Sequence, residues 1–124
     1  VLVLELGGND GLRGVDVSAT EDNLRAIIDT TLSKYPEAHV VLAGMQIPPN
    51  LGPQYTQAFR DMYPAIASSY EQVSLVPFVL EGVGGVDSLM QGDRIHPTAS
   101  GQRYVADNVW DTLRPILNDL RRQS

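Results

Sequence analysis

The chain has 124 residues, which fits one domain, since single domains cluster at about 100 to 150 residues. Hydrophobic residues make up 43% and charged residues 19%, so a packed core is expected and a disordered chain is excluded. A net charge of −6 without a basic stripe argues against nucleic acid as a partner, the lack of cysteine excludes disulfides and thiolate metal sites, and no apolar run reaches the roughly 18 residues of a membrane span.

The first predicted element is a strand over Val1–Leu6, an almost continuous apolar run that ends at Gly7 and Gly8. Such a run is typical of a parallel strand that is buried on both faces. Ser18 and Glu21 then have the spacing of a capping box. This spacing predicts the start of an amphipathic helix that continues to residue 35.

The middle of the chain predicts another strand and helix, followed by a third strand. Val40–Ala43 is a short apolar run, and a loop rich in proline and glycine follows over residues 47–53. Apolar side chains at helical spacing over residues 55–70 predict a helix that Pro64 kinks, and residues 73–78 predict the third strand.

A glycine-rich stretch over residues 82–85 precedes the segment Asp93–His96, and a long helix over residues 104–120, bent at Pro115, closes the chain. The order is therefore strand, helix, strand, helix, strand, helix. This order predicts an α/β fold with a parallel sheet and right-handed crossovers, formed by residues 1–124 as a single domain.

Two polar segments follow predicted strands, where ligand sites form in parallel α/β sheets. In one of them, Asp93 precedes His96 by three residues, so its carboxylate can reach the inner imidazole nitrogen and hold the tautomer that a general base needs. The same spacing also fits a local cap by Asp93 and a surface histidine. In the other segment, Asn9 offers an amide that can donate to an oxyanion, although Asn, Asp and Gly are also ordinary turn formers.

Taken together, Gly-Gly-Asn-Asp at 7–10 and Asp-Arg-Ile-His-Pro at 93–97 resemble the third and fifth conserved blocks of the SGNH, or GDSL, hydrolases. The stretch Val1–Gly14 is similar to the branch of bacterial periplasmic thioesterases, lysophospholipases and arylesterases. The resemblance implies a three-layer α/β/α flavodoxin-like fold with sheet order 2-1-3-4-5. This chain would supply its C-terminal portion, with strands three to five of the family order.

The resemblance also implies roles for individual residues in the hydrolysis of carboxylic esters or thioesters. His96 would be the general base, Asp93 its orienting carboxylate and Asn9 an oxyanion-hole donor, with no metal and no organic cofactor. Loop residues at the same end of the sheet either line an acyl groove or serve ordinary loop packing; these are Leu12, Arg13, Ile47, Pro48, Leu51 and Tyr55.

The nucleophile of the family has no counterpart in this chain. No serine follows Gly-Asp at a strand end, and the Gly-x-Ser-x-Gly elbow of other esterases is absent as well. Ser100, the serine nearest to His96 in sequence, is expected to begin the closing helix. The other histidine, His39, precedes the second strand and is expected at the far end of the sheet.

The first strand would then lie beside an absent serine-bearing strand, and a bare apolar edge invites pairing with another chain. Two hypotheses follow: an esterase whose N-terminal fragment supplies the serine, or an inert truncated module that self-associates through Val1–Leu6. Nucleotide binding is disfavoured, because Gly82 and Gly84 lack the third glycine of a dinucleotide fingerprint. The expected ligand is a small-molecule or lipid ester, and the resemblance favours a periplasmic or secreted location.

Overall fold

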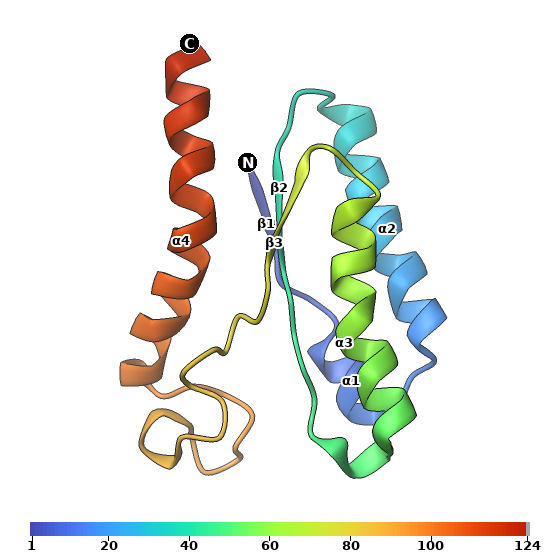
Figure 1. Ribbon diagram of the computed structural model, residues 1–124, viewed down its shortest axis with the longest axis vertical. Coiled ribbons are helices and arrows are strands. Elements are labelled where there is room, and N and C mark those ends of the chain that lie inside the picture. The colour runs from blue at the N-terminus through green and yellow to red at the C-terminus, as the bar shows by residue number, and fades with distance from the viewer. Residues whose placement is uncertain (124) are drawn as a thin grey trace. The chain divides into compact units, whose positions relative to one another are not determined.

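The computed structural model describes residues 1–123. The chain divides into two compact units, Val1–Pro77 and Phe78–Ser124. The first unit contains a small sheet with its helices, and the second contains a long loop and the last helix (Figure 1). Whether both units act as one domain, as the sequence predicts, stays a prediction.

The sheet of the first unit has three parallel strands, β1 (Leu2–Leu4), β2 (Val40–Ala43) and β3 (Val73–Val76), in the order β1-β2-β3. Two helices connect them, α2 (Val17–Lys34) and α3 (Pro53–Ser68). Figure 1 shows both helices on the same side of the strands. The predicted α/β class with a parallel sheet is therefore confirmed.

The core of this unit lies between the sheet and the two helices. All four residues of β2 are buried, because this strand has a neighbour on each edge. A fully buried aliphatic or aromatic side chain contributes roughly 1.5 to 3 kcal/mol through the hydrophobic effect. The buried apolar side chains from the sheet and from α2 and α3 include Leu4, Val40, Leu42, Leu24, Ile28, Phe59, Met62 and Ile66.

The first strand is shorter and more exposed than the sequence predicts. It covers Leu2–Leu4 instead of Val1–Leu6, and the side chains of Val3 and Leu6 are 41% and 55% exposed. The expected burial on both faces is therefore wrong. The reason is that β1 pairs only with β2 and forms an edge of the sheet that residues 1–123 describe.

The cap of α2 is also different from the predicted one. Asp16 is the N-cap residue, and its Oδ1 accepts the backbone N–H of Ser18 at 3.1 Å and the Ser18 hydroxyl at 3.0 Å. Glu21 instead pairs with Arg25 at 3.0 Å. Aspartate and serine cap equally well, so the upstream aspartate determines where the helix begins.

The second unit contains the short 3-10 helix η2 (Asp87–Leu89) and α4 (Ala99–Gln123). The Nδ2 of Asn108 in α4 donates to the carbonyls of Val79 and Glu81 at 3.0 and 2.9 Å, which fixes the start of the long loop. Helix α4 begins next to Ser100, as predicted, and runs through Pro115, as α3 runs through Pro64; the kinks at both prolines stay predictions.

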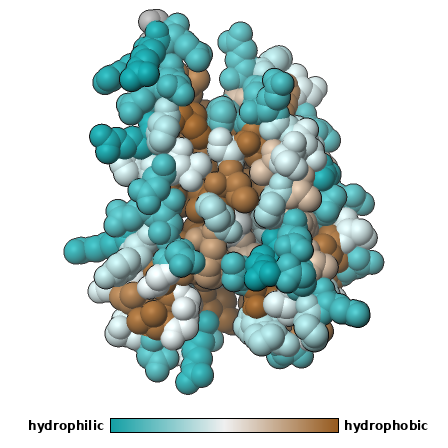
Figure 2. Space-filling view, viewed as in Figure 1, coloured by the Kyte–Doolittle hydropathy of each residue, from teal (hydrophilic) through white to brown (hydrophobic). Residues whose placement is uncertain are grey.

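The surface seen in Figure 2 is mostly hydrophilic and is interrupted by hydrophobic patches. Among residues 1–123, no helix is long and apolar enough to span a bilayer. The exposed large apolar side chains include Val1, Val3 and Leu6 in the first unit and Tyr104, Trp110 and Leu117 in α4.

Candidate active site

The segment after β1 is a short helix, α1 (Gly8–Arg13), which the sequence analysis missed. Two glycines with left-handed backbone enclose it, Gly7 with φ 107° and Gly14 with φ 70°. A helix of six residues that contains two glycines shows no apolar period, so only the flanking glycines could have indicated it.

Tyr63 of α3 holds the backbone at the start of this segment. Its side chain is almost completely buried, and its hydroxyl donates to the carbonyl of Leu6 at 2.9 Å. A Cβ on Gly7 would collide with that hydroxyl. Burial, and then the charge of Asp10, raises the pKa of Tyr63, so the hydroxyl remains a donor.

Two further contacts attach α1 to the rest of the unit. The hydroxyl of the buried Thr20 in α2 donates to Asp10 Oδ2 at 3.0 Å. Gly11 is buried, and a Cβ there would come within 2.7 Å of side-chain atoms of both Ile47 and Phe59. The position of α1 therefore depends on buried partners from α2, from α3 and from the loop before α3.

Asn9 lies in the first turn of α1, and its side chain is exposed. Within residues 1–123 its amide makes no hydrogen bond. The two amide N–H groups are thus available to an oxygen atom outside the described chain, as an oxyanion donor requires.

The six residues expected to line a groove differ in exposure. Ile47 is a core residue with 8% exposure, so it packs inside the unit and does not face a ligand. Tyr55 is half-buried, and its hydroxyl donates to the carbonyl of Val15 at 2.5 Å. The remaining four side chains are exposed and can contact a ligand: Leu12, Arg13, Pro48 and Leu51.

The structure brings Asp93 and His96 together in the second unit. His96 Nδ1 donates to Asp93 Oδ2 at 2.7 Å, since an ionised carboxylate only accepts. Asp93 Oδ1 accepts the backbone N–H groups of Ile95 at 2.9 Å and His96 at 3.1 Å. The hydrogen bond from the His96 side chain, followed by those from the two backbone groups, lowers the pKa of Asp93 to about 2.

This geometry leaves the outer imidazole nitrogen of His96, Nε2, able to accept a proton from a reacting group. With the proton on Nδ1, Nε2 is an acceptor, and the side chain is 67% exposed. No serine hydroxyl hydrogen-bonds to it within residues 1–123. Ser100 lies in the first turn of α4, as expected, and Thr98 Oγ1 accepts the N–H of Gly101 there at 3.2 Å.

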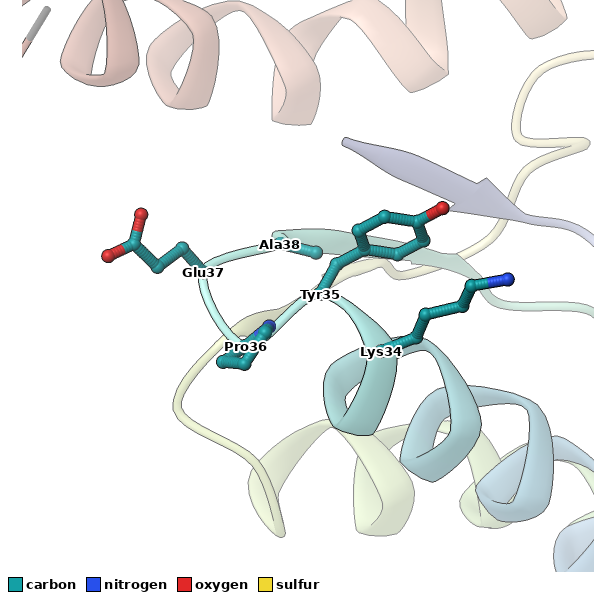
Figure 3. Close-up of a pocket in the computed structure, with 5 residues that line it drawn as sticks. All are labelled: Lys34, Tyr35, Pro36, Glu37 and Ala38. Atoms are coloured by element: carbon teal, nitrogen blue, oxygen red, sulfur yellow. The ribbon is translucent and has the colours of Figure 1, made fainter.

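His39 lies directly before β2, at the amino end of the sheet, as the sequence predicts. Its Nε2 is 3.0 Å from the hydroxyl of Ser74, and burial lowers its pKa. A surface pocket at the same end lies on the turn between α2 and β2 (Figure 3). Lys34 and Tyr35 line it side by side, whereas Asn9 follows the opposite, carboxyl end of β1.

Residues 1–104 match the GDSL-like lipase/acylhydrolase family. The chain belongs to this family. Esterase TesA of Pseudomonas aeruginosa is 47% identical over 117 residues, which are 94% of this chain and 57% of that protein. Thioesterase 1/protease 1/lysophospholipase L1 of Escherichia coli is 38% identical, over 94% of this chain and 55% of that protein. The chain thus spans just over half the length of these curated relatives.

Solved structures of GDSL-like hydrolases have the same fold. The crystal structure of TesA superposes with a TM-score of 0.83, covering 93% of this chain and 62% of that one at 47% identity. The psychrotrophic esterase EstA from Pseudoalteromonas sp., inhibited by monoethylphosphonate, gives a TM-score of 0.80 at 32% identity and covers 94% of this chain and 62% of that one. The chain therefore has part of the α/β fold of the SGNH hydrolases.

Sequence reasoning missed the residues that support the two GDSL segments. Tyr63 lies four residues after Phe59 on the apolar face of α3, so its helical spacing indicated burial but gave no sign of the bond to Leu6. Nothing in the sequence pointed to Thr20 as a donor to Asp10, because the two residues meet only after α1 and α2 have formed.

Proposed function

We propose that the complete protein hydrolyses carboxylic esters or thioesters through a Ser-His-Asp acyl-enzyme mechanism. His96 is the general base, Asp93 its orienting carboxylate and Asn9 an oxyanion-hole donor, and an N-terminal segment outside this chain supplies the serine. The hydrogen bond of 2.7 Å between His96 Nδ1 and Asp93 Oδ2 carries the proposal, because it leaves Nε2 as the acceptor for a serine proton. Membership of the GDSL-like family supports the reaction class.

The mechanism begins when His96 Nε2 accepts the proton of the serine hydroxyl while the serine oxygen attacks the substrate carbonyl. Asp93 stabilises the imidazolium, and the Asn9 amide donates to the developing oxyanion; such a donor is worth about 2.7 to 4 kcal/mol in the transition state. His96 then protonates the leaving alcohol or thiol. Water, activated by His96 in the same way, hydrolyses the acyl-enzyme and releases the carboxylic acid.

The proposed substrate is a small-molecule or lipid ester. The exposed apolar side chains of Leu12, Pro48 and Leu51 are suited to contact an acyl chain, whereas Ile47 belongs to the core and Tyr55 packs against the core. Arg13 can contact a polar or charged leaving group. No metal or organic cofactor enters the mechanism, and we also propose a periplasmic or secreted location, in keeping with the family resemblance.

This chain by itself is proposed to be inactive. Its length, just over half that of the curated relatives, and the absence of a serine at His96 Nε2 within residues 1–123 support this part of the proposal. The alternative is an inert module that self-associates through β1, and the exposed Val1, Val3 and Leu6 favour it. Val3→Pro removes an edge N–H and should then shift the chain from dimer to monomer in size-exclusion chromatography with light scattering.

The main test uses a fluorophosphonate probe and a panel of aryl esters, acyl thioesters and lysophospholipids. The purified chain is assayed alone and with a serine-bearing N-terminal segment, and intact mass identifies the labelled polypeptide. Label on the added segment and ester hydrolysis that His96→Ala abolishes are expected. His39→Ala is the matched control, since it removes the other histidine, and it should retain activity. Label on this chain, or full activity in His96→Ala, would overturn the proposal.

A further inference from the structure

The Asp93–His96 segment is the tip of a short loop that closes on itself. At its base, the N–H of Thr98 donates to the carbonyl of Leu89 at 2.9 Å, and nearer the tip the N–H of Gln91 donates to the carbonyl of His96 at 2.8 Å. The tip is exposed, so these bonds, and not burial in a core, determine its conformation.

Gln91 makes a second contact through its side chain. Its Nε2 donates to the carbonyl of Pro97 at 3.1 Å. One residue therefore binds the carbonyls of two consecutive residues, His96 and Pro97, with its backbone and its side chain. These bonds fix the two peptide groups that follow the Cα of His96.

Asp93 acts on the opposite side of the same Cα. Its Oδ1 accepts the N–H of His96, so the peptide group before this Cα is fixed as well. The backbone of His96 is thus held from one side by Asp93 and from the other by Gln91. Since backbone dihedrals determine where a Cα–Cβ bond points, both residues together set the direction of the imidazole.

We propose that Gln91 is a positioning residue that directs His96 Nε2 toward the reacting serine. This inference depends on the proposed function, because it assumes that His96 is the general base. Asp93 fixes the tautomer and the preceding peptide, whereas Gln91 fixes the following ones. The loop base provides a rigid support: Gly101 of α4 is buried directly under the carbonyl of Leu89, where a Cβ would collide with it.

The test replaces Gln91 by methionine, which has a similar length but no donor. With the serine-bearing segment present, Gln91→Met should lower kcat about 10-fold and leave KM within about twofold, since misdirection of a catalytic group affects the chemical step more than substrate binding. Gln91→Glu, which keeps the shape and cannot donate when ionised, should lose as much. Gln102→Met is the matched control, because this glutamine is exposed in α4 outside the loop; it should leave kcat unchanged.

A second measurement on this chain alone separates the inference from the proposed function. In Gln91→Met, NMR relaxation should show a lower order parameter for the His96 backbone N–H, while the pKa of Asp93 stays near 2, because none of the bonds that lower it involves Gln91. An unchanged order parameter would overturn the role of Gln91. A return of the Asp93 pKa toward its ordinary value would also overturn this role. Gln91 would then maintain the conformation of the whole loop instead of orienting His96 alone. A wild-type complex without activity would instead count against the proposed function.

Discussion

The segments that carry Asn9 and His96 differ in what holds them in place. The backbone before Asn9 is bound at Leu6 by Tyr63, 57 residues away along the chain, and the side chain of Asp10 after it accepts from a buried hydroxyl of α2. The tip that carries His96 is bound by Asp93 and Gln91, which lie within five residues of it along the chain and are exposed. The first segment is therefore a property of the folded unit, whereas the second is a local motif. Mutations in the first should affect stability, and mutations in the second should affect catalysis alone.

Asp93→Asn should give the largest effect and should separate catalysis from stability. The amide cannot hold His96 in the tautomer that leaves Nε2 as acceptor, so kcat of the complex with the serine-bearing segment should fall roughly 10⁴-fold. Because Asp93 is exposed, the thermal unfolding midpoint should stay the same within error. A clear fall in this midpoint, measured by calorimetry, would contradict the idea that the loop is only a local motif.

Gly7→Ala should give the largest loss of stability. Alanine is disfavoured at φ 107°, and its Cβ would collide with the Tyr63 hydroxyl, so the free energy of unfolding should fall by about 3 kcal/mol. Urea denaturation measures this loss of unfolding free energy. Gly14→Ala is the control, because Gly14 also has positive φ but its Cβ would meet Leu51 at an ordinary 3.4 Å; its loss should be about 1 kcal/mol. Equal losses in the two variants would show that the collision with Tyr63 does not contribute to the loss of stability.

Tyr63→Phe tests the hydrogen bond between Tyr63 and the Leu6 carbonyl with a smaller change. The ring stays in the core, but the carbonyl of Leu6 loses its donor, which should cost about 1 to 2 kcal/mol of unfolding free energy. Tyr70→Phe removes a hydroxyl that donates to Asp29 at an exposed site, and its cost should be smaller. If the two variants were equally stable in urea, the bond to Leu6 would not anchor the segment.

The two regions also differ in how far the sequence could predict them. The spacing of Asp93 and His96 predicted their hydrogen bond correctly, because every partner of the pair lies within the loop. The segment of Asn9 was predicted as a turn or an oxyanion donor, and its helix α1 was missed, because its conformation depends on Tyr63 and Thr20. The apolar runs and the alternating order of strands and helices predicted the parallel sheet. However, no pattern within a strand tells which of its edges lacks a neighbouring strand.

The smallest effect concerns the pKa of Asp93, which tests whether the His96 loop is independent of the rest of the fold. Because this pKa is lowered to about 2, the carboxylate form of the loop is favoured above the ordinary carboxyl pKa of about 3.9 and is lost as the pH falls through about 2. The ¹³C shift of the Asp93 carboxyl should follow this titration. In His96→Ala the midpoint should rise, since the largest cause disappears, but stop short of the ordinary value, because two backbone N–H groups still donate to Oδ1. In Gly7→Ala the midpoint of the Asp93 titration should not move. A midpoint that shifted in Gly7→Ala would show that the loop depends on distant structure after all.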